Sequence, residues 1–300
     1  MINYTIIIPH KNIPHFLVRC LDSIPLREDV QVIVVDDNSD ITEVNGINLL
    51  ILPEKYPNIE FIWGKNENRR KGAGYARNLG LERAKGKWLI FADADDFFMP
   101  CFNEVLDKYV DDDSDIIFFK ATSINLETLL LDTRHDYVNN PLAEIQRTNN
   151  WNIAIQINVP WGKFIKRDII IKNKINFQEV QHSNDVLFSV KLAIVDAKSK
   201  ISDCELYCIT NRNDSLTSTE SAKFLKKRFN VAYNAYTFLK IHKKESYFRD
   251  TIWYWWVKVC DVNYFVALSL FFKMCKIYGF SCMLKIVKKK FTNRLKRILR

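Results

Sequence analysis

Residues 87–96 read KWLIFADADD, and this stretch decides the fold class because a continuous apolar run ends directly in acidic residues. Further β-branched or apolar runs occur at residues 4–8, where Pro9 is expected to end the run, and at 30–35, 59–63 and 115–119. Helical patterns separate them at residues 16–24 and 75–85, and Gly86 follows where a C-terminal cap glycine belongs. Strands and helices in this alternation predict an α/β fold with a mostly parallel sheet flanked by helices.

The composition excludes a disordered or fibrous chain, because 48% of the 300 residues are hydrophobic and 26% are charged. The net charge of +9 is unevenly distributed. Residues 1–221 carry 25 − 32 = −7, whereas residues 222–300 carry 19 − 3 = +16. Such segregation predicts that the C-terminal part meets a phosphate-rich polymer or anionic lipid. We therefore expect a catalytic or binding domain at residues 1–220 and a helical, basic extension at residues 221–300.

The seven cysteines form no regular framework, and Cys204 and Cys208 have no second pair or His cluster nearby in the sequence. We therefore expect reduced thiols and no zinc site. The chain starts directly with a strand-like run, so we expect no signal peptide. The apolar run at residues 264–272 is far shorter than the roughly 20 residues of a membrane span. These features favour a cytoplasmic protein that does not cross the bilayer.

Asp93 and Asp95 follow the apolar run, and the period of two along a strand projects both carboxylates together. Two carboxylates this close repel each other unless they share a proton or a cation lies between them. Mg²⁺ is often held by one or two carboxylates together with substrate phosphates. The pair therefore favours a divalent cation site at the carboxyl end of the sheet, where ligands bind. The alternative is an acidic turn.

A second acidic pair, Asp36 and Asp37, ends the strand predicted at residues 30–35. A carboxylate there can accept hydrogen bonds from a ribose hydroxyl or a base N–H. The alternative is a capped turn with no ligand. The sequence leaves both interpretations open.

The segment at residues 69–78 places cations and small residues at a helix start, which suits a diphosphate. Its candidate ligands are Arg70, Lys71 and Arg77. A dinucleotide fingerprint beginning at Gly72 would need its third glycine at position 77, and the sequence has no Gly-Lys-Ser/Thr phosphate loop. NAD-dependent enzymes and P-loop ATPases are therefore disfavoured.

Five motifs occur in order along the first hundred residues: Ile6–Pro9, Val34–Ser39, Ala76–Gly80, Ala84–Trp88 and Phe91–Asp96. Together they resemble the family-2 glycosyltransferases with the GT-A fold, as found in bacterial capsule and lipopolysaccharide assembly. The resemblance is strong over residues 3–120 and extends weakly to about residue 217. It implies a nucleotide-binding half at about 1–120 and an acceptor half at about 121–220.

The resemblance also implies roles for individual residues. Pro9 would line the nucleotide pocket, and Asp37 would contact the uracil or the ribose. Asp93 would bind on the ribose side, and Asp95 would hold Mn²⁺ or Mg²⁺ against the diphosphate. Arg212 is expected to close over the diphosphate, with a plain surface loop as the alternative.

Two later stretches extend the resemblance. Residues 160–164 resemble a Trp-x-Lys-Leu/Phe element, and residues 182–188 resemble a Glu-Asp-x-x-Phe element whose Asp is the catalytic base. Asp185 would be that base, and Asn184 stands where the Glu is usual. A carboxylate can accept the proton of an attacking sugar hydroxyl, and a metal-bound diphosphate is a good leaving group. The alternative for Asp185 is a carboxylate favoured by a helix dipole.

The end of the chain has an apolar stripe at helical spacing beside a dense cationic face: Leu284, Val287, Phe291, Leu295 and Ile298 form the stripe. This pattern suits an interfacial helix on anionic lipid, and residues 253–256 add aromatic side chains typical of the headgroup region. A helix packed on the catalytic domain is the first alternative. Nucleic-acid binding is the second, and no stacking module supports it.

These observations predict an inverting, metal-dependent glycosyltransferase that uses a nucleotide-sugar donor, expected to be UDP-linked. Its acceptor would be a saccharide or a lipid-linked sugar, and the enzyme would act peripherally at the inner face of the cell membrane. A dehalogenase-type phosphatase also carries Asp-x-Asp but expects Thr or Val where Phe97 stands. The non-enzymatic alternative is an inactive membrane- or polyanion-binding protein with a GT-A-like domain.

Overall fold

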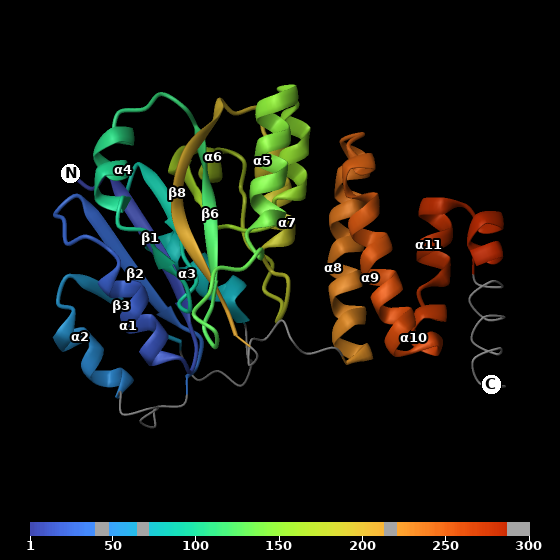
Figure 1. Cartoon of the computed structure of the whole chain (residues 1–300), viewed down its shortest axis with the longest axis horizontal. Helices are drawn as coiled ribbons and strands as arrows, with labels where there is room; N and C mark the ends of the chain where they lie inside the picture. The colour runs from blue at the N-terminus through green and yellow to red at the C-terminus, as the bar shows by residue number, and fades with distance from the viewer. Residues whose placement is uncertain (40–47, 65–71, 213–220, 287–300) are drawn as a thin grey trace. The chain divides into compact units, whose positions relative to one another are not determined.

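A computed structural model describes residues 1–39, 48–64, 72–212 and 221–286. The chain forms two compact units, Met1–Ser215 and Leu216–Arg300 (Figure 1). Two of the predicted diphosphate ligands, Arg70 and Lys71, lie outside the described residues. So does the apolar stripe at the end of the chain from Val287 onward.

Within the described part of the first unit, eight strands form one sheet in the order β3-β2-β1-β4-β7-β6-β8-β5. Their bounds are β1 Tyr4–His10, β2 Val30–Asp36, β3 Ile59–Trp63, β4 Trp88–Phe91, β5 Phe97–Phe98, β6 Ile116–Asn125, β7 Lys163–Lys166 and β8 Ser199–Asn211. The ladders β1–β2, β2–β3, β1–β4 and β6–β8 are parallel. β7 runs antiparallel to both β4 and β6, and β5 runs antiparallel to β8. The predicted mostly parallel sheet is confirmed.

The described helical segments of the first unit alternate with these strands and pack against the sheet (Figure 1). They are α1 Pro14–Asp22, η1 Leu49–Ile51, α2 Leu52–Lys55, α3 Gly72–Arg83, α4 Phe102–Tyr109, α5 Asp136–Thr148, η2 Trp151–Gln156, α6 Arg167–Lys172 and α7 Val186–Ile194. Helix α3 lies on β1 and β2, where Gly80 allows close contact because a Cβ there would lie 2.5 Å from Ile7 Cγ2.

Two local predictions are wrong. Strand β1 does not end before Pro9 but continues to His10, because its ladder with β2 reaches Asp36 although the ladder with β4 ends at Ile7. Gly86 does not cap helix α3, which already ends at Arg83. Gly86 instead passes against β1, where a Cβ would lie 2.5 Å from the backbone nitrogen of Thr5.

The second unit is helical, as expected from its pattern, with α8 Ala222–Ile241, η3 Glu245–Phe248, α9 Arg249–Val262, α10 Tyr264–Leu268 and α11 Phe271–Tyr278. Helix α8 packs on α9, and buried side chains including Phe229, Phe248 and Trp256 form the core of the unit. Among the helices of the described residues, none is long and apolar enough to span a membrane.

Of the four aromatic residues at 253–256, Trp256 is buried in the unit and so is not available to lipid headgroups. Trp253 and Trp255 are partly exposed, with Trp253 edge-on against Tyr278 at a centroid distance of 5.5 Å, and Tyr254 is 52% exposed. A headgroup contact of these three residues stays a prediction. More strongly exposed aromatic side chains lie further along the chain, at Phe265, Phe272 and Phe280.

Candidate functional site

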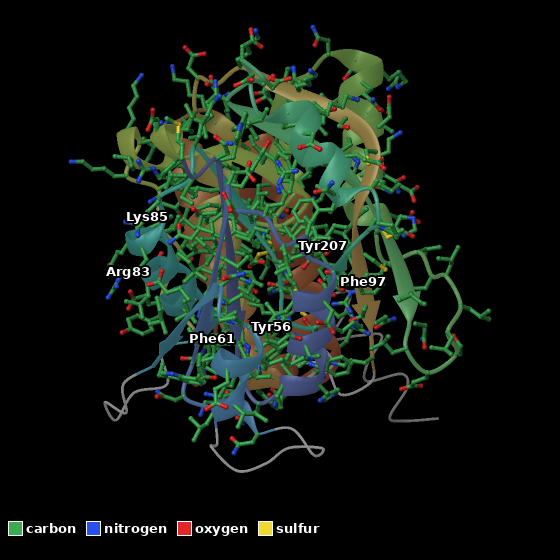
Figure 2. All side chains as sticks on the ribbon, turned by 90° about the vertical axis from the view of Figure 1, so that its left-hand side faces the viewer. Tyr56, Phe61, Arg83, Lys85, Phe97 and Tyr207 are labelled. Carbon is green, nitrogen blue, oxygen red and sulfur yellow. The ribbon has the colours of Figure 1, made fainter. Side chains whose placement is uncertain are left out.

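The carboxyl ends of β1, β2 and β4 meet at one edge of the sheet, and the acidic pairs predicted from the sequence follow β2 and β4 there. Tyr207 and Thr210, near the end of strand β8, contact the loop after β4 that carries Asp93 and Asp96. Figure 2 shows Tyr207 of β8 and Phe97 of β5 on one side of the unit. Arg83, the last residue of α3, and Lys85, which follows the helix, lie on the opposite side of that view. We call the cluster of Asp93, Asp95, Asp96 and the side chains bonded to them the acidic loop site.

Asp93 is fixed by two contacts. Its backbone N–H donates to the hydroxyl of Tyr207 at 2.7 Å, and its carboxylate pairs with Arg77 of α3 at 2.5 Å. The same guanidinium donates to Oδ1 of Asn184 at 2.7 Å, and Arg77 is 5% exposed. Arg77 therefore ties the end of β4 to the loop before α7.

The link through Arg77 explains how Asn184 serves in place of the usual Glu. The amide Oδ1 supplies one of the acceptors that a carboxylate would offer. Because the amide is neutral, the charge of Arg77 is balanced by Asp93. Both amino groups of the guanidinium are already bonded within the protein. Arg77 therefore holds these two loops together, and its predicted contact with the diphosphate stays a prediction.

Asp185 lies directly before α7 and is half-buried, and its carbonyl oxygen accepts from the backbone N–H of Ser189 at 2.9 Å. Its carboxylate is close enough to act electrostatically on Lys163 and on Tyr137. The predicted base is thus one residue from Asn184, and Arg77 holds that loop beside Asp93.

Asp95 has a fixed backbone and a half-buried carboxylate. Its carbonyl oxygen accepts hydrogen bonds from Arg19 of α1 and from the hydroxyl of Thr210. Its carboxylate pairs with Arg212 at 3.2 Å, so the residue predicted to bind diphosphate contacts the residue predicted to bind the metal. Burial and then the charge of Asp93 raise the pKa of Asp95, and Arg212 opposes that shift.

Asp96 has a different role from its neighbours. It is 3% exposed, and its carboxyl accepts from the backbone N–H of Thr210 at 2.8 Å. Burial, followed by the charges of Asp95 and Asp93, raises the pKa of Asp96 well above its ordinary value. Burial and the neighbouring negative charges therefore favour a protonated Asp96, whose carboxyl joins the loop after β4 to strand β8.

The donor set at this loop fits a hard divalent cation that also binds phosphate oxygens. Among the described residues, no three His, Cys, Asp or Glu side chains converge in a way that could hold a metal ion. Asp93 is paired with Arg77 and Asp95 with Arg212, so the Asp95 carboxylate, 28% exposed, would become available as an oxygen ligand when Arg212 moves away, and its role as metal ligand stays a prediction. One carboxylate plus substrate phosphates is a common arrangement for Mg²⁺. A cation would also relieve the unfavourable burial of this negative charge.

The acidic pair at the end of β2 is buried, with Asp36 6% and Asp37 8% exposed, and its two members have different hydrogen-bond partners. Asp36 accepts from His10 Nδ1 at 2.9 Å and from Ser39 N at 2.8 Å. Burial opposes ionisation of Asp36, but these hydrogen bonds outweigh it and lower its pKa. Asp37 Oδ1 accepts from the backbone N–H of Gly72 at 3.2 Å, which joins β2 to the start of α3. Pro9 is buried in β1 opposite Val35.

Lys163 of β7 is the least expected charged group near the site. It is 2% exposed, donates to the carbonyl oxygen of Val159 and lies 5.5 Å from the ring centre of Phe118. Burial lowers the pKa of Lys163 to about 7, and the carboxylate of Asp185 acts in the opposite direction. A proton on Lys163 is therefore coupled to the charge of the predicted base.

Several residues of this site were missed by sequence reasoning. Tyr207, Thr210 and Arg19 come from segments with no motif, and they reach the loop only because β8 and α1 flank it in space. His10 contacts Asp36, and its place directly after the Ile6–Pro9 motif could have indicated that it lies near the site.

Comparison with known proteins assigns the class and then the family. The fold is that of the GT-A transferases. It resembles the crystal structure of residues 1–349 of Staphylococcus aureus TarS in complex with UDP-GlcNAc, with a TM-score of 0.58 and 22% identity over 79% of this chain and 66% of that one. A mannosyltransferase from Pyrobaculum calidifontis in complex with GDP-Man and Mn²⁺ gives a TM-score of 0.56 and 14% identity over 98% and 80%. The chain belongs to glycosyl transferase family 2, whose sequence profile matches residues 5–173.

Curated relatives agree with this family. The uncharacterized glycosyltransferase YibD of Escherichia coli is 24% identical over 71% of this chain, and the cholesterol galactosyltransferase of Borreliella burgdorferi is 28% identical over 65%. The matches span 62% and 55% of the lengths of those two relatives. The predicted family and fold are confirmed.

Proposed function

We propose that this protein transfers a sugar from a nucleotide-sugar donor, a UDP-sugar, to a saccharide or lipid-linked acceptor with inversion at the anomeric carbon. The observation that carries the proposal is the bridge from Asp93 through Arg77 to Asn184. It holds the acidic loop site and the loop of Asp185 in one fixed arrangement. A donor site and a base held together are what single displacement requires.

The chemistry assigns a task to each part. The acceptor hydroxyl oxygen forms a bond to the anomeric carbon while the bond from that carbon to the diphosphate oxygen breaks, and the diphosphate leaves with the electron pair. Asp185 takes the hydroxyl proton. Arg212 would exchange its contact with Asp95 for the diphosphate. A divalent ion held by Asp95 would supply neutralisation of the leaving group.

UDP is the proposed nucleotide because TarS, a neighbour in fold, forms complexes with UDP and UDP-GlcNAc, and the GDP-Man complex of the mannosyltransferase makes a GDP-sugar the alternative donor. A role in assembly of a cell-surface polysaccharide fits relatives such as the poly(ribitol-phosphate) beta-glucosyltransferase of Bacillus spizizenii. Nucleic acid is not expected among the partners.

The test is a screen for UDP release by the purified full chain with a panel of UDP-sugars, with and without Mn²⁺. Asp95→Ala should remove the stimulation by Mn²⁺. Asp185→Asn should keep UDP affinity within about twofold and lower transfer at least 10²-fold, in line with the usual contribution of a general base. Glu82→Gln, on the exposed part of α3, is the matched control and should behave as the wild type. Unimpaired transfer by Asp185→Asn would remove Asp185 from the mechanism.

We also propose that the second unit holds the enzyme on the inner face of the membrane. Phe265, Phe272 and Phe280 are 82%, 75% and 58% exposed, and residues 222–300 carry a net charge of 19 − 3 = +16. Exposed aromatics beside a cationic surface suit an interface with anionic lipid. The triple change of these phenylalanines to serine should weaken sedimentation with phosphatidylglycerol vesicles and leave UDP affinity unchanged.

The vesicle experiment also addresses the non-enzymatic alternative. An inactive lipid- or polyanion-binding protein would sediment with the vesicles and would bind no UDP. Equal sedimentation with neutral phosphatidylcholine vesicles would contradict the electrostatic part of the proposal.

A further inference from the structure

Tyr137 is an exposed aromatic residue among the charged groups of the site. It lies in the first turn of α5 and is 44% exposed. Its hydroxyl makes no hydrogen bond to any residue in the described part of the chain. Protein atoms packed around the phenol raise its pKa, and Arg134, Asp96 and Asp185 are the nearby charges with the largest further effects. The charges of Asp96 in the acidic loop site and of Asp185 thus both act on the phenol.

The ring of Tyr137 is rigidly supported from behind. It packs edge-on against Trp161, with centroids 6.0 Å apart and an angle of 72° between the planes. Trp161 is 3% exposed and stacks on Tyr207 at 5.2 Å. The hydroxyl of Tyr207 accepts from the backbone N–H of Asp93. A continuous column of aromatic rings therefore fixes Tyr137 relative to the donor side of the site.

A pyranose is the chemical class that such a surface suits. One face of a pyranose ring consists of C–H groups that pack on an aromatic face, whose π electrons attract their partial positive charge. Its hydroxyls need acceptors at the edge, and the carboxylate of Asp185 is such an acceptor. Ligand sites commonly combine an apolar platform with a few polar groups in this way.

We propose that Tyr137 is the platform on which the acceptor sugar stacks, so that one of its hydroxyls faces Asp185. The inference rests on the proposed function, and it adds the position and the class of the acceptor. Tyr137 would contribute through its ring and not through its hydroxyl. The conservative change to phenylalanine therefore separates this role from hydrogen bonding.

The experiment uses the full chain saturated with UDP and Mg²⁺, which is diamagnetic, and measures binding of methyl glycosides by saturation-transfer NMR. The probes are the methyl glycosides of glucose, galactose, mannose, rhamnose and N-acetylglucosamine. For the best probe, Tyr137→Ala should weaken binding at least tenfold, and Tyr137→Phe should stay within twofold of the wild type. Tyr56→Ala is the control, because Tyr56 lies on the turn after α2 and is bonded to Asp22 at 2.7 Å.

Each outcome decides one question. If the wild type fails to bind UDP in calorimetry, the proposed function fails and the acceptor platform fails with it. If UDP binds but Tyr137→Ala retains glycoside affinity, or no probe binds to the wild type, the platform alone is refuted. Equal losses in Tyr137→Phe and Tyr137→Ala would assign the effect to the hydroxyl and also overturn the proposal. Thermal unfolding of each variant checks that it is folded.

Discussion

Replacing the buried Lys163 by methionine should change how the stability of the first unit depends on pH. Burial lowers the pKa of Lys163 to about 7 in the folded chain, against an ordinary value of 10.5, while Asp185 opposes the shift. Between these pH values the unfolded chain binds a proton that the folded chain does not. The free energy of unfolding of the wild type therefore rises with pH in this range. Below pH 7 both states are protonated, and the full cost of burying the charge remains.

The magnitude follows from the shift. Each pH unit in the window contributes about 1.4 kcal/mol, and the whole shift of 10.5 − 7 = 3.5 units corresponds to roughly 5 kcal/mol. Methionine has a similar length and no charge, so the variant lacks this rise. Because the folded-state lysine is still half protonated at pH 7, the stability of the wild type relative to Lys163→Met should increase by about 2 kcal/mol between pH 7 and pH 9.

The assay is urea unfolding followed by tryptophan fluorescence at pH 6, 7, 8 and 9 in buffers of equal ionic strength. The difference between wild type and variant cancels the titration of all other groups. Asp185→Asn provides a second check. Removing this carboxylate should lower the pKa of Lys163 further, so the increase in the free energy of unfolding should begin at a lower pH. A difference between wild type and Lys163→Met that stays constant from pH 6 to pH 9 would refute the reasoning.

Three further predictions concern the acidic loop site and its support. Arg77→Gln breaks a buried ion pair with Asp93 and should lower the free energy of unfolding by about 3 kcal/mol, measured by urea unfolding. An unchanged urea midpoint would contradict this prediction. Gly74→Ala would bring a Cβ to 2.1 Å from the carbonyl oxygen of Gln178, so we expect a loss of about 2 kcal/mol in the same assay, and no loss would show that the loop can move aside. The raised pKa of Asp96 means that the folded chain keeps a proton which the unfolded chain loses above pH 4. The stability of the wild type relative to Asp96→Asn should therefore fall from pH 4 to pH 7 in the same assay. A rise over this range would contradict a protonated Asp96 in the folded chain.

The sequence predicted the strands of the first half of the sheet well, because β1, β2, β3 and β4 are mostly apolar runs, but it did not predict their order in the sheet, β3-β2-β1-β4. It did not predict β7 and β8. β7 has only four residues, Lys163–Lys166, and β8 begins with a mostly polar stretch before its short apolar run at Leu206–Ile209, so neither shows the continuous apolar pattern of a parallel strand over its whole length. Their place is set by tertiary pairing with β6, which no local pattern reports.

The candidate site was predictable to the extent that it lies in motifs. Asp37, Asp93, Asp95 and Asp185 were found in this way, and their catalytic and binding roles remain proposals. The partners of these carboxylates were not predictable, because Arg77, Arg212 and Tyr207 contact them across long stretches of sequence. The pairing of Arg212 with Asp95 in particular depends on where β8 ends.

The anchoring of the Asp95 carbonyl by Arg19 and Thr210 has a practical consequence. Since α1 and β8 already hold the main chain of this loop, accommodating a donor would require little more than rotation of the side chains of Asp95 and Arg212. Crystals grown without ligand should therefore tolerate soaking with nucleotide and manganese without cracking. A soak of that kind is a direct route to viewing the donor in place.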